Sequence, residues 1–245
     1  MARWSPATTT VPAMPVVDAL PQLVRPRGPL ATLPPAHVEE LLRSGVPRAF
    51  GAGEVILQQG AASDRVHVLM SGRVRVTGVT ADGVELTLAL LGPGETVGEL
   101  AVLDQSPRAA TVAALEPVTT IAVDGARYLS ALRAHPDALL AVVHHLADRV
   151  RDLDRRLLET RSGDTVTRLA RELLRLGARY GVATPHGLAL DVPLSQEQLA
   201  SMIGVTREST SGALRTLRAR GAVRTGRMRI HLTDIAALRE VASSG

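Results

Sequence analysis

Short segments in which hydrophobic and polar residues alternate, separated by turns that contain glycine, fill residues 52–123. Two clear examples are 74–77 (VRVT) and 85–90 (ELTLAL), and the pair Asp82-Gly83 supplies the turn between them. A β-strand turns successive side chains to opposite faces, so this alternation predicts half-buried strands. Many short strands at such spacing are typical of a β-sandwich or a small barrel.

Further along the chain the apolar residues recur at steps of four and three, which a helix places along one narrow seam. The seam consists of Leu139, Val143, Leu146, Val150, Leu153 and Leu157. Charged residues fill the other faces, and we predict a helix over residues 138–162 that forms a parallel coiled coil in a homodimer. The alternative is a single amphipathic helix packed on its own domain. A parallel dimer would pass its two-fold symmetry on to the segment that follows.

The C-terminal part of the chain has the pattern of short helices joined by tight turns. An amphipathic helix is predicted over residues 166–176. A capping box of Ser195 and Gln198 opens the next helix, since each side chain can bond the backbone amide of the other residue. Gly204 ends that helix, and Thr206 caps a second one. This is the order of a helix-turn-helix.

The second helix of this pair has an apolar face and a polar face. Thr210, Leu214 and Leu217 form the apolar face, and Arg207, Glu208, Ser211, Arg215 and Arg218 form the other. Such a helix fits the major groove of double-stranded DNA. Arg207 is suited to guanine and Glu208 to cytosine, while the two later arginines suit phosphates. Residues 222–232, with Arg229, are predicted to form a β-hairpin wing over the DNA backbone. The alternative is a small helical domain whose arginines are merely solvated.

Composition and charge fit this division of the chain. A length of 245 residues suits two domains, with 12 arginines and 14 acidic residues before residue 150, and 16 and 10 from there on. A basic C-terminal part after a nearly neutral N-terminal part suggests a sensor followed by a segment that binds an anionic partner. Residues 1–33, rich in proline, threonine and alanine, are predicted to be a disordered extension, and a short helix is predicted after Pro34-Pro35.

Several classes of protein are excluded at this stage. The absence of cysteine removes disulfides, thiol catalysis and cysteine-ligated metal centres. No apolar run is long enough to span a bilayer, and the N-terminus lacks the pattern of a secretory signal, so we expect a cytoplasmic protein without membrane contact. No nucleophile–base pair, metal-ligand cluster or nucleoside triphosphate loop is found, so we expect neither an enzyme nor a metal site.

Residues 98–111 (GELAVLDQSPRAAT) carry the most specific pattern in the chain. Glu99 stands nine residues before Arg108, and the candidate site around them consists of small and apolar residues. These are Gly98, Leu100, Ala101, Ala109 and Ala110. A cyclic nucleotide needs such a pair, because a carboxylate accepts from the ribose 2′-hydroxyl and a guanidinium binds the singly charged phosphate through two hydrogen bonds. The glycine lets the backbone approach the ligand.

The same run closely resembles the phosphate-binding cassette of cyclic-nucleotide-binding domains. Two further motifs lie at 194–200 (LSQEQLA) and 203–209 (IGVTRES). With these motifs and the cassette, residues 34–240 resemble the cyclic-AMP receptor protein/FNR (Crp/Fnr) family of bacterial transcription regulators. The resemblance implies an α+β protein with a jelly-roll sensor over 34–137, a dimerisation helix over 138–162 and a winged helix-turn-helix over 163–245. It also implies cyclic AMP as ligand, with cyclic GMP possible, and a palindromic DNA operator, a second copy of the chain and RNA polymerase as partners.

The sequence departs from the family at two places. Family members use a second arginine further along the recognition helix, where this chain has Gly212. The family's base-contacting hydroxyls on the dimer helix correspond to Leu153, which cannot hydrogen-bond a base, and Asp154, which can accept from an amine. Two alternatives follow: a DNA-binding relative that is constitutive or answers another effector, and a ligand-binding module that acts through protein contacts.

Overall fold

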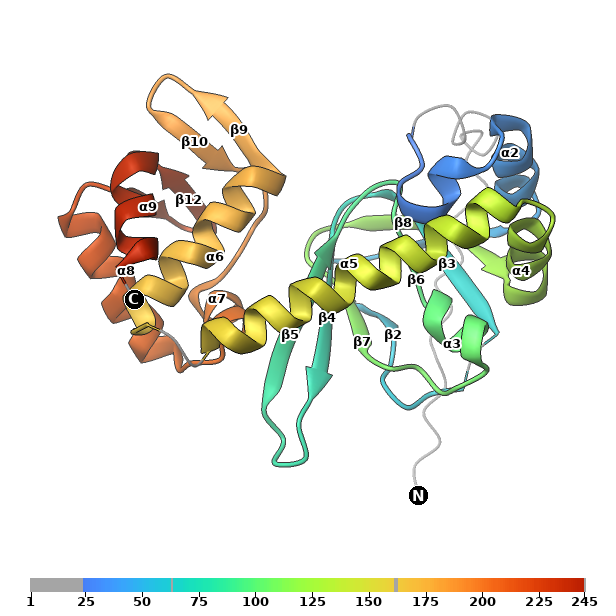
Figure 1. Cartoon of the computed structure of the whole chain (residues 1–245), viewed down its shortest axis with the longest axis horizontal. Coiled ribbons are helices and arrows are strands. Elements are labelled where there is room, and N and C mark those ends of the chain that lie inside the picture. Colours follow the sequence, from blue (N-terminus) through green and yellow to red (C-terminus); the bar gives the residue numbers. More distant parts are fainter. Residues whose placement is uncertain (1–23, 63, 161–162, 245) are drawn as a thin grey trace.

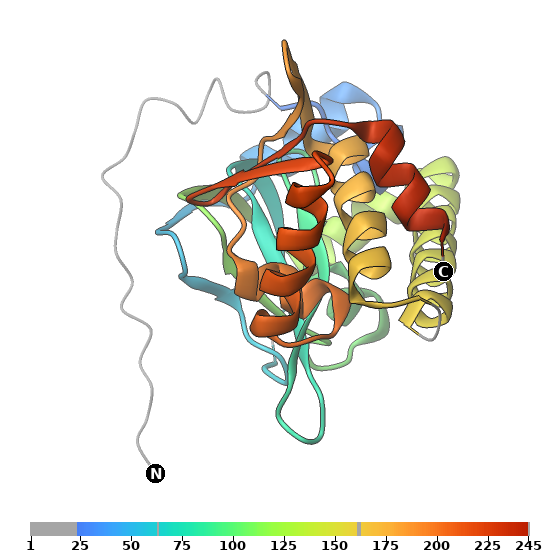
Figure 2. The same ribbon diagram turned by 90° about the vertical axis from the view of Figure 1, so that its left-hand side faces the viewer.

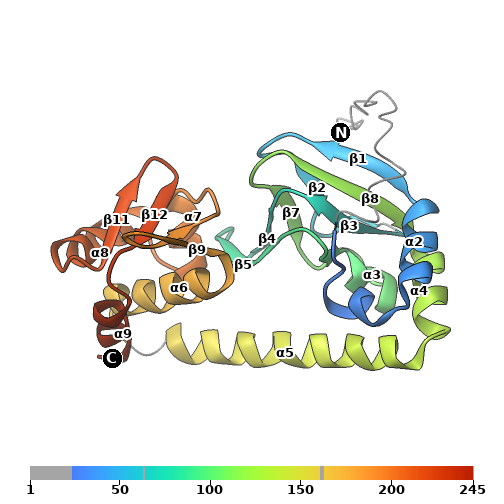
Figure 3. The same ribbon diagram turned by 90° about the horizontal axis from the view of Figure 1, so that it is seen from above.

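The computed structural model describes residues 24–62, 64–160 and 163–244, so most of the predicted extension lies outside the described residues. Two domains lie at opposite ends of an elongated molecule, and the 25-residue helix α5 (Pro136–Thr160) runs along one side of it (Figures 1 and 3). Figure 2 looks along the molecule from the C-terminal domain. Within the described ranges, no helix is long and apolar enough to cross a membrane.

The N-terminal domain is a sandwich of two four-stranded antiparallel sheets, in the orders β1-β8-β3-β6 and β2-β7-β4-β5. The strands are β1 (Val46–Phe50), β2 (Val55–Leu57), β3 (Arg65–Ser71), β4 (Val74–Val79), β5 (Glu85–Leu91), β6 (Thr96–Val97), β7 (Thr111–Ala114) and β8 (Val118–Asp124). Inward-facing residues such as Leu69, Val74 and Val112 form an apolar core between the sheets. The β-sandwich predicted from the alternating segments is therefore confirmed.

Helices close one side of this sandwich. They are the 3₁₀ helix η1 (Gly28–Thr32), α2 (Pro35–Arg43), α3 (Glu99–Asp104) and α4 (Gly125–Arg133). The predicted helix after Pro34-Pro35 is α2, and its Val38, Leu41 and Leu42 are buried. Residues 24–33 differ from the expected disordered extension, since Leu30 is fully buried and Leu33 is 5% exposed in the same core. The folded domain thus begins before residue 34.

Helix α5 covers the predicted dimerisation helix except for residues 161–162, which lie outside the described residues. Ala138 and Val142 are buried against the N-terminal domain, whereas most of the seam is open, with Leu139, Val143, Val150, Leu153 and Leu157 between 40% and 63% exposed. Leu146 is half-buried against the domain's own core. One helix therefore presents one face to its own domain and a second apolar face to solvent.

The C-terminal domain is a helix-turn-helix on a four-stranded sheet of order β11-β12-β10-β9. Its elements are α6 (Thr165–Tyr180), β9 (Gly181–Thr184), β10 (Gly187–Leu190), α7 (Gln196–Ile203), α8 (Arg207–Ala219), β11 (Val223–Gly226), β12 (Arg229–Leu232) and α9 (Ile235–Ser243). The capping box is present, because Gln198 N donates to Ser195 Oγ over 3.1 Å and Ser195 N donates to Gln198 Oε1 over 2.8 Å. The predicted wing is the hairpin β11–β12. The sequence prediction missed the hairpin β9–β10, whose strands have four residues each and no clear alternation.

The two domains meet along β5, the edge strand of its sheet. Leu90 of β5 is buried in the apolar core of the C-terminal domain, and its carbonyl oxygen accepts from Tyr180 Oη over 2.8 Å. Ser201 Oγ of α7 donates to the carbonyl oxygen of Glu85 over 3.0 Å. Because α7 packs against β5, which has no strand partner on this side, the C-terminal domain is docked directly on the sheet of the first domain.

Candidate functional site

Gly98 joins strand β6 to helix α3 and turns the chain at the start of the predicted cassette. Its φ of +87° lies in the left-handed region that favours glycine. A Cβ at this position would also lie 2.5 Å from Arg108 Nη1. Any side chain here would therefore collide with the guanidinium, so the backbone conformation and the close approach both require glycine.

The guanidinium of Arg108 is held in place by backbone carbonyl groups. Arg108 is only 3% exposed, and its Nη1 donates to the carbonyl oxygen of Gly98 over 2.6 Å, while Nη2 donates to that of Arg65 over 2.5 Å. The main chain of Arg108 is fixed as well, because its amide donates to Ala61 O and its carbonyl accepts from Gly60 N. The positive charge is thus positioned before any ligand binds.

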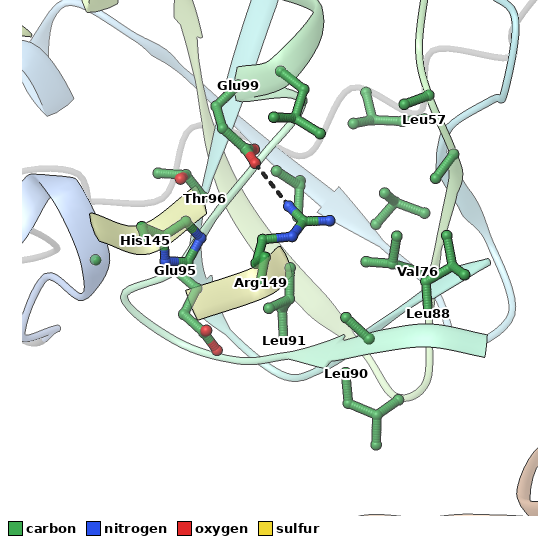
Figure 4. A pocket seen from close by; sticks show the side chains of 18 of the residues that line it. Leu57, Val76, Leu88, Leu90, Leu91, Glu95, Thr96, Glu99, His145 and Arg149 are labelled. Carbon is green, nitrogen blue, oxygen red and sulfur yellow. Dashed lines mark hydrogen bonds and ion pairs between the residues drawn. The ribbon is translucent and has the colours of Figure 1, made fainter. Parts of the chain in front are cut away.

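Glu99, the first residue of α3, is 8% exposed, and burial raises the pKa of its carboxyl group above the usual value. Arg149 of α5 opposes that shift, because its Nη1 lies 3.3 Å from Glu99 Oε1 (Figure 4). The ion pair connects the cassette to the long helix. Glu99 therefore has a cationic partner within its own chain.

These residues line a cavity of about 340 Å³ between the sandwich and α5. This volume lies within the usual range of small-molecule pockets. Of the predicted ligand-binding residues, Gly98, Glu99, Leu100, Ala101, Arg108, Ala109, Ala110 and Leu153 line it. Asp154 does not line the pocket and is exposed on α5. The structure thus brings together all but one of the predicted residues.

The pocket also has walls that sequence reasoning missed. They include Leu88–Leu91 of β5, His145 and Arg149 of α5, Arg27–Pro29 ahead of the sandwich, and Arg179 of the C-terminal domain. Arg149 and His145 had a sequence signal, since they lie one and two helical turns before Leu153 and so on the same face. The other walls come from segments far away in the sequence. Figure 4 shows His145, Glu95 and Thr96 on one side of the cavity and Leu57, Val76 and Leu88 on the other.

Helix α8 presents the predicted polar face to solvent. Arg207, Glu208, Arg215 and Arg218 are exposed, Ser211 is half-buried, and Arg229 is exposed on β12. Thr206 caps α8 by accepting from the amide of Ser209 over 3.2 Å, and Thr210, Leu214 and Leu217 are buried behind it. Arg218 Nη1 donates to Thr225 Oγ1 of the wing over 3.4 Å. The helix and the wing thus form one basic surface.

Comparisons with known proteins agree with both halves of this description. Residues 47–135 match the model of the cyclic nucleotide-binding domain, and residues 167–241 match that of the Crp-like helix-turn-helix domain. The chain is 31% identical over 210 residues to a cyclic AMP receptor protein of Thermus thermophilus, covering 86% of this chain and 94% of that one. It is 27% identical over 200 residues to a CRP-like cAMP-activated global transcriptional regulator of Mycobacterium tuberculosis, covering 82% and 89%.

A solved structure shows the same arrangement. The crystal structure of a transcriptional regulator of the CRP/FNR family from Thermus thermophilus superposes with a TM-score of 0.66 at 27% identity. The match covers 81% of this chain and 99% of that one. The similarity therefore extends across both domains and the helix that connects them.

Proposed function

The chain belongs to the CRP/FNR family of transcription regulators, and we propose that it is a homodimer whose DNA binding responds to a cyclic nucleotide, with cyclic AMP favoured over cyclic GMP. The observation that carries the proposal is the meeting of Glu99 and Arg108 in one cavity, nine residues apart in sequence but both buried at its wall. One side chain suits a sugar hydroxyl and the other suits a singly charged phosphate. The names of the relatives support cyclic AMP as the ligand.

The proposed binding chemistry follows from the fixed orientation of the Arg108 guanidinium. The cyclic phosphate would bind at Arg108, whose orientation two backbone carbonyls already fix. The ribose 2′-hydroxyl would donate to Glu99, which also accepts from Arg149. Because Arg149 belongs to α5, occupancy of the pocket would act on the helix that carries the dimer seam. A ligand shifts an equilibrium between two dimer arrangements only by its different affinity for each.

The open seam of α5 supports the homodimer. Val143 is 58% exposed and Leu157 is 63% exposed, although both are large apolar side chains in a heptad pattern. A second copy of the same helix offers the matching seam. In the active arrangement the two recognition helices would lie about 34 Å apart, one turn of DNA.

At the DNA, Arg207 and Glu208 are the proposed base readers, and Arg215, Arg218 and Arg229 the proposed phosphate contacts. Thr206 and Ser211 border them on α8. Gly212 stands at the later reading position and has no side chain, so the operator should have a half-site that differs from the family's usual one.

A second candidate function is DNA binding in answer to a different effector. Leu153 lines the cavity but offers a base no hydrogen bond, and Asp154 lies outside the wall formed within one chain. Neither residue, within one chain, offers a purine base a hydrogen bond in the cavity, so specific recognition of the base is weakened. Neither observation weakens the recognition of the phosphate and the ribose.

Isothermal titration calorimetry with cyclic AMP and cyclic GMP tests the proposal. We expect a Kd of about 1 µM or lower for one of them in the wild type. Arg108→Ala should lower that affinity at least about 100-fold, since the charged donors to the phosphate are lost. Arg75→Ala is the control, because Arg75 is a half-buried arginine of the same sandwich that pairs with Glu85 and does not line the pocket.

Two outcomes would contradict the proposal. If the wild type binds neither nucleotide, the second candidate function takes its place. If Arg108→Ala binds as tightly as Arg75→Ala, the cassette is not the phosphate site. A shift assay on a palindromic operator, with and without nucleotide and at two salt concentrations, then measures the response of DNA binding.

A further inference from the structure

The segment Arg25–Pro29, called the strap from here on, precedes both matched domains in the sequence and lies against the turn between β5 and β6. The amide of Arg27 donates to the carbonyl oxygen of Gly94 over 2.8 Å. Gly94 has a φ of +87°, and a Cβ there would overlap the carbonyl oxygen of Arg25. The strap is therefore seated directly on the backbone of this turn, with no room for a side chain between them.

The other end of the strap is fixed beneath α5. Pro29 and Leu30 are buried, and η1 packs against α5. Gly28, with a φ of +59°, faces the ring of His145, whose Nδ1 would lie 3.7 Å from a Cβ at this position. The strap thus runs from the β5–β6 turn to the long helix and closes the gap between them.

This gap is one side of the pocket. Arg27, Gly28 and Pro29 line the same cavity as Glu99 and Arg108, on the side where Figure 4 shows His145 and Glu95. Arg25, two residues earlier on the strap, does not line this cavity and instead borders a neighbouring hollow with Met70. Arg27 borders both spaces, whereas Arg25 borders only the second.

The cations at the pocket differ in what they already bind. Arg108 donates to two backbone carbonyls, Arg149 pairs with Glu99, and Arg179 Nη2 lies 2.7 Å from Glu95 Oε1. Within the ranges that the structure describes, no hydrogen bond or ion pair engages the guanidinium of Arg27, which is exposed to the solvent and to the cavity. An anion in the pocket would gain from this charge without breaking an existing pair.

We propose that the strap is a wall of the ligand site and that Arg27 is a ligand-binding residue outside the cassette, which attracts the anionic phosphate of the bound nucleotide. This inference rests on the proposed function. The strap closes one side of the pocket, so it slows ligand dissociation, and Arg27 adds to the positive potential that the phosphate meets. Since the guanidinium is exposed, its contribution decreases as salt is added.

Two pairs of variants of the full-length chain test this inference, with affinity for cyclic AMP and cyclic GMP as the readout. Arg27→Ala should weaken binding about fivefold at low salt and less at high salt, and Arg25→Ala should change it by less than about twofold. Gly94→Ala should weaken binding at least as much as Arg27→Ala, because the new Cβ displaces the strap. Gly83→Ala is its control, since Gly83 has a φ of +85° and no heavy atom within 4 Å of a Cβ.

Trypsin cleavage of the bond between Arg27 and Gly28 reports the position of the strap independently of affinity. Cleavage should be faster in Gly94→Ala than in Gly83→Ala, and bound nucleotide should slow it in the wild type. Wild-type binding that is unchanged in both Arg27→Ala and Gly94→Ala overturns this inference alone. A wild type that binds neither nucleotide overturns the proposed function and this inference with it.

Discussion

At the scale of single residues, the pocket depends on charged groups that are buried before any ligand arrives. Arg108 is 3% exposed and Glu99 is 8% exposed, and each has partners that offset the loss of hydration. Gly98 makes this arrangement possible by leaving room for the guanidinium. Gly98 and Arg108 of the cassette therefore depend on each other, because a side chain at position 98 would collide with the guanidinium.

His67, on β3, is a second buried titratable group near Arg108, and it predicts how stability depends on pH. Burial lowers the pKa of its imidazole from 6.5 to about 4, with Arg108, Arg48 and Arg65 adding to the shift. Between these two pKa values the unfolded chain takes up a proton that the folded chain does not. Folding is therefore destabilised as the pH falls from 6.5 towards 4, by about 2 kcal/mol at pH 5, and the loss levels off below that window.

Urea unfolding at pH 7.5 and pH 5, at one protein concentration, measures this effect. His67→Gln should be less stable at pH 7.5, because it disturbs a buried contact with Thr120, but it should lose less stability than the wild type on going to pH 5. His186→Gln, which changes an exposed histidine, should keep the wild-type difference. Equal pH dependence in His67→Gln and the wild type would contradict the assignment.

At the scale of elements, α5 has two apolar faces with different partners. Ala138 and Val142 are buried against the sandwich, and Arg149 reaches Glu99, whereas the seam through Val143 and Leu157 is open. A helix that is apolar on two faces needs two partners, and one chain supplies only the first. The helix therefore links the pocket to the proposed dimer contact.

Substitutions at two adjacent leucines of α5 distinguish the loss of a dimer contact from the general effect of adding a charge to the surface. Leu157 lies in the seam, and Leu158, 70% exposed, lies beside it and outside the heptad positions a and d. Leu157→Glu should convert the homodimer to monomer, because it places two charges opposite each other in the seam. Leu158→Glu should leave the dimer intact. Sedimentation of both variants at the same concentration measures the outcome, and identical behaviour of the two would contradict the proposed seam.

At the scale of the whole molecule, two arginines of α6 that lie one helical turn apart form ion pairs with the sandwich and with α5. Arg179 Nη2 lies 2.7 Å from Glu95 Oε1 at the pocket, and Arg175 Nη1 lies 2.5 Å from Glu159 Oε2 at the end of α5. Arg175 also binds Glu172 of its own helix, whose side chain is 3% exposed. The position of the C-terminal domain is thus set by contacts with the sandwich and with the long helix.

Loss of Arg175 should destabilise the whole chain. Arg175→Ala leaves the carboxylate of Glu172 buried without a cation, and we expect the free energy of unfolding to decrease by about 3 kcal/mol. Glu172→Gln added to Arg175→Ala should recover part of that loss. Arg151→Ala removes an exposed ion pair with Asp148 and should cost less than about 1 kcal/mol. Urea unfolding of all four proteins provides the comparison, and an Arg175→Ala variant as stable as Arg151→Ala would contradict the prediction.

Much of the fold follows from local patterns in the sequence. Alternation predicted the strands of the sandwich, and the residues of the capping box predicted the start of α7. The spacing of Glu99 and Arg108 predicted two residues that line one cavity. The strands β9 and β10 were missed because their sequences, GVAT and GLAL, show no clear alternation of polar and apolar residues. Patterns within one segment are visible in sequence because neighbouring residues share the same backbone geometry.

The tertiary structure alone decided which distant segments complete the pocket. Arg149 meets Glu99 across 50 positions of sequence, and Arg179 meets Glu95 across 84. The strap reaches the pocket only because Gly94 leaves space for the carbonyl of Arg25. Such contacts cannot be predicted from a period or a motif in the sequence, since they depend on how the helices and the sheets pack. The sequence by itself determined the elements and the cassette, and packing determined the walls around the cassette, because a wall is set by distances between elements rather than by order along the chain.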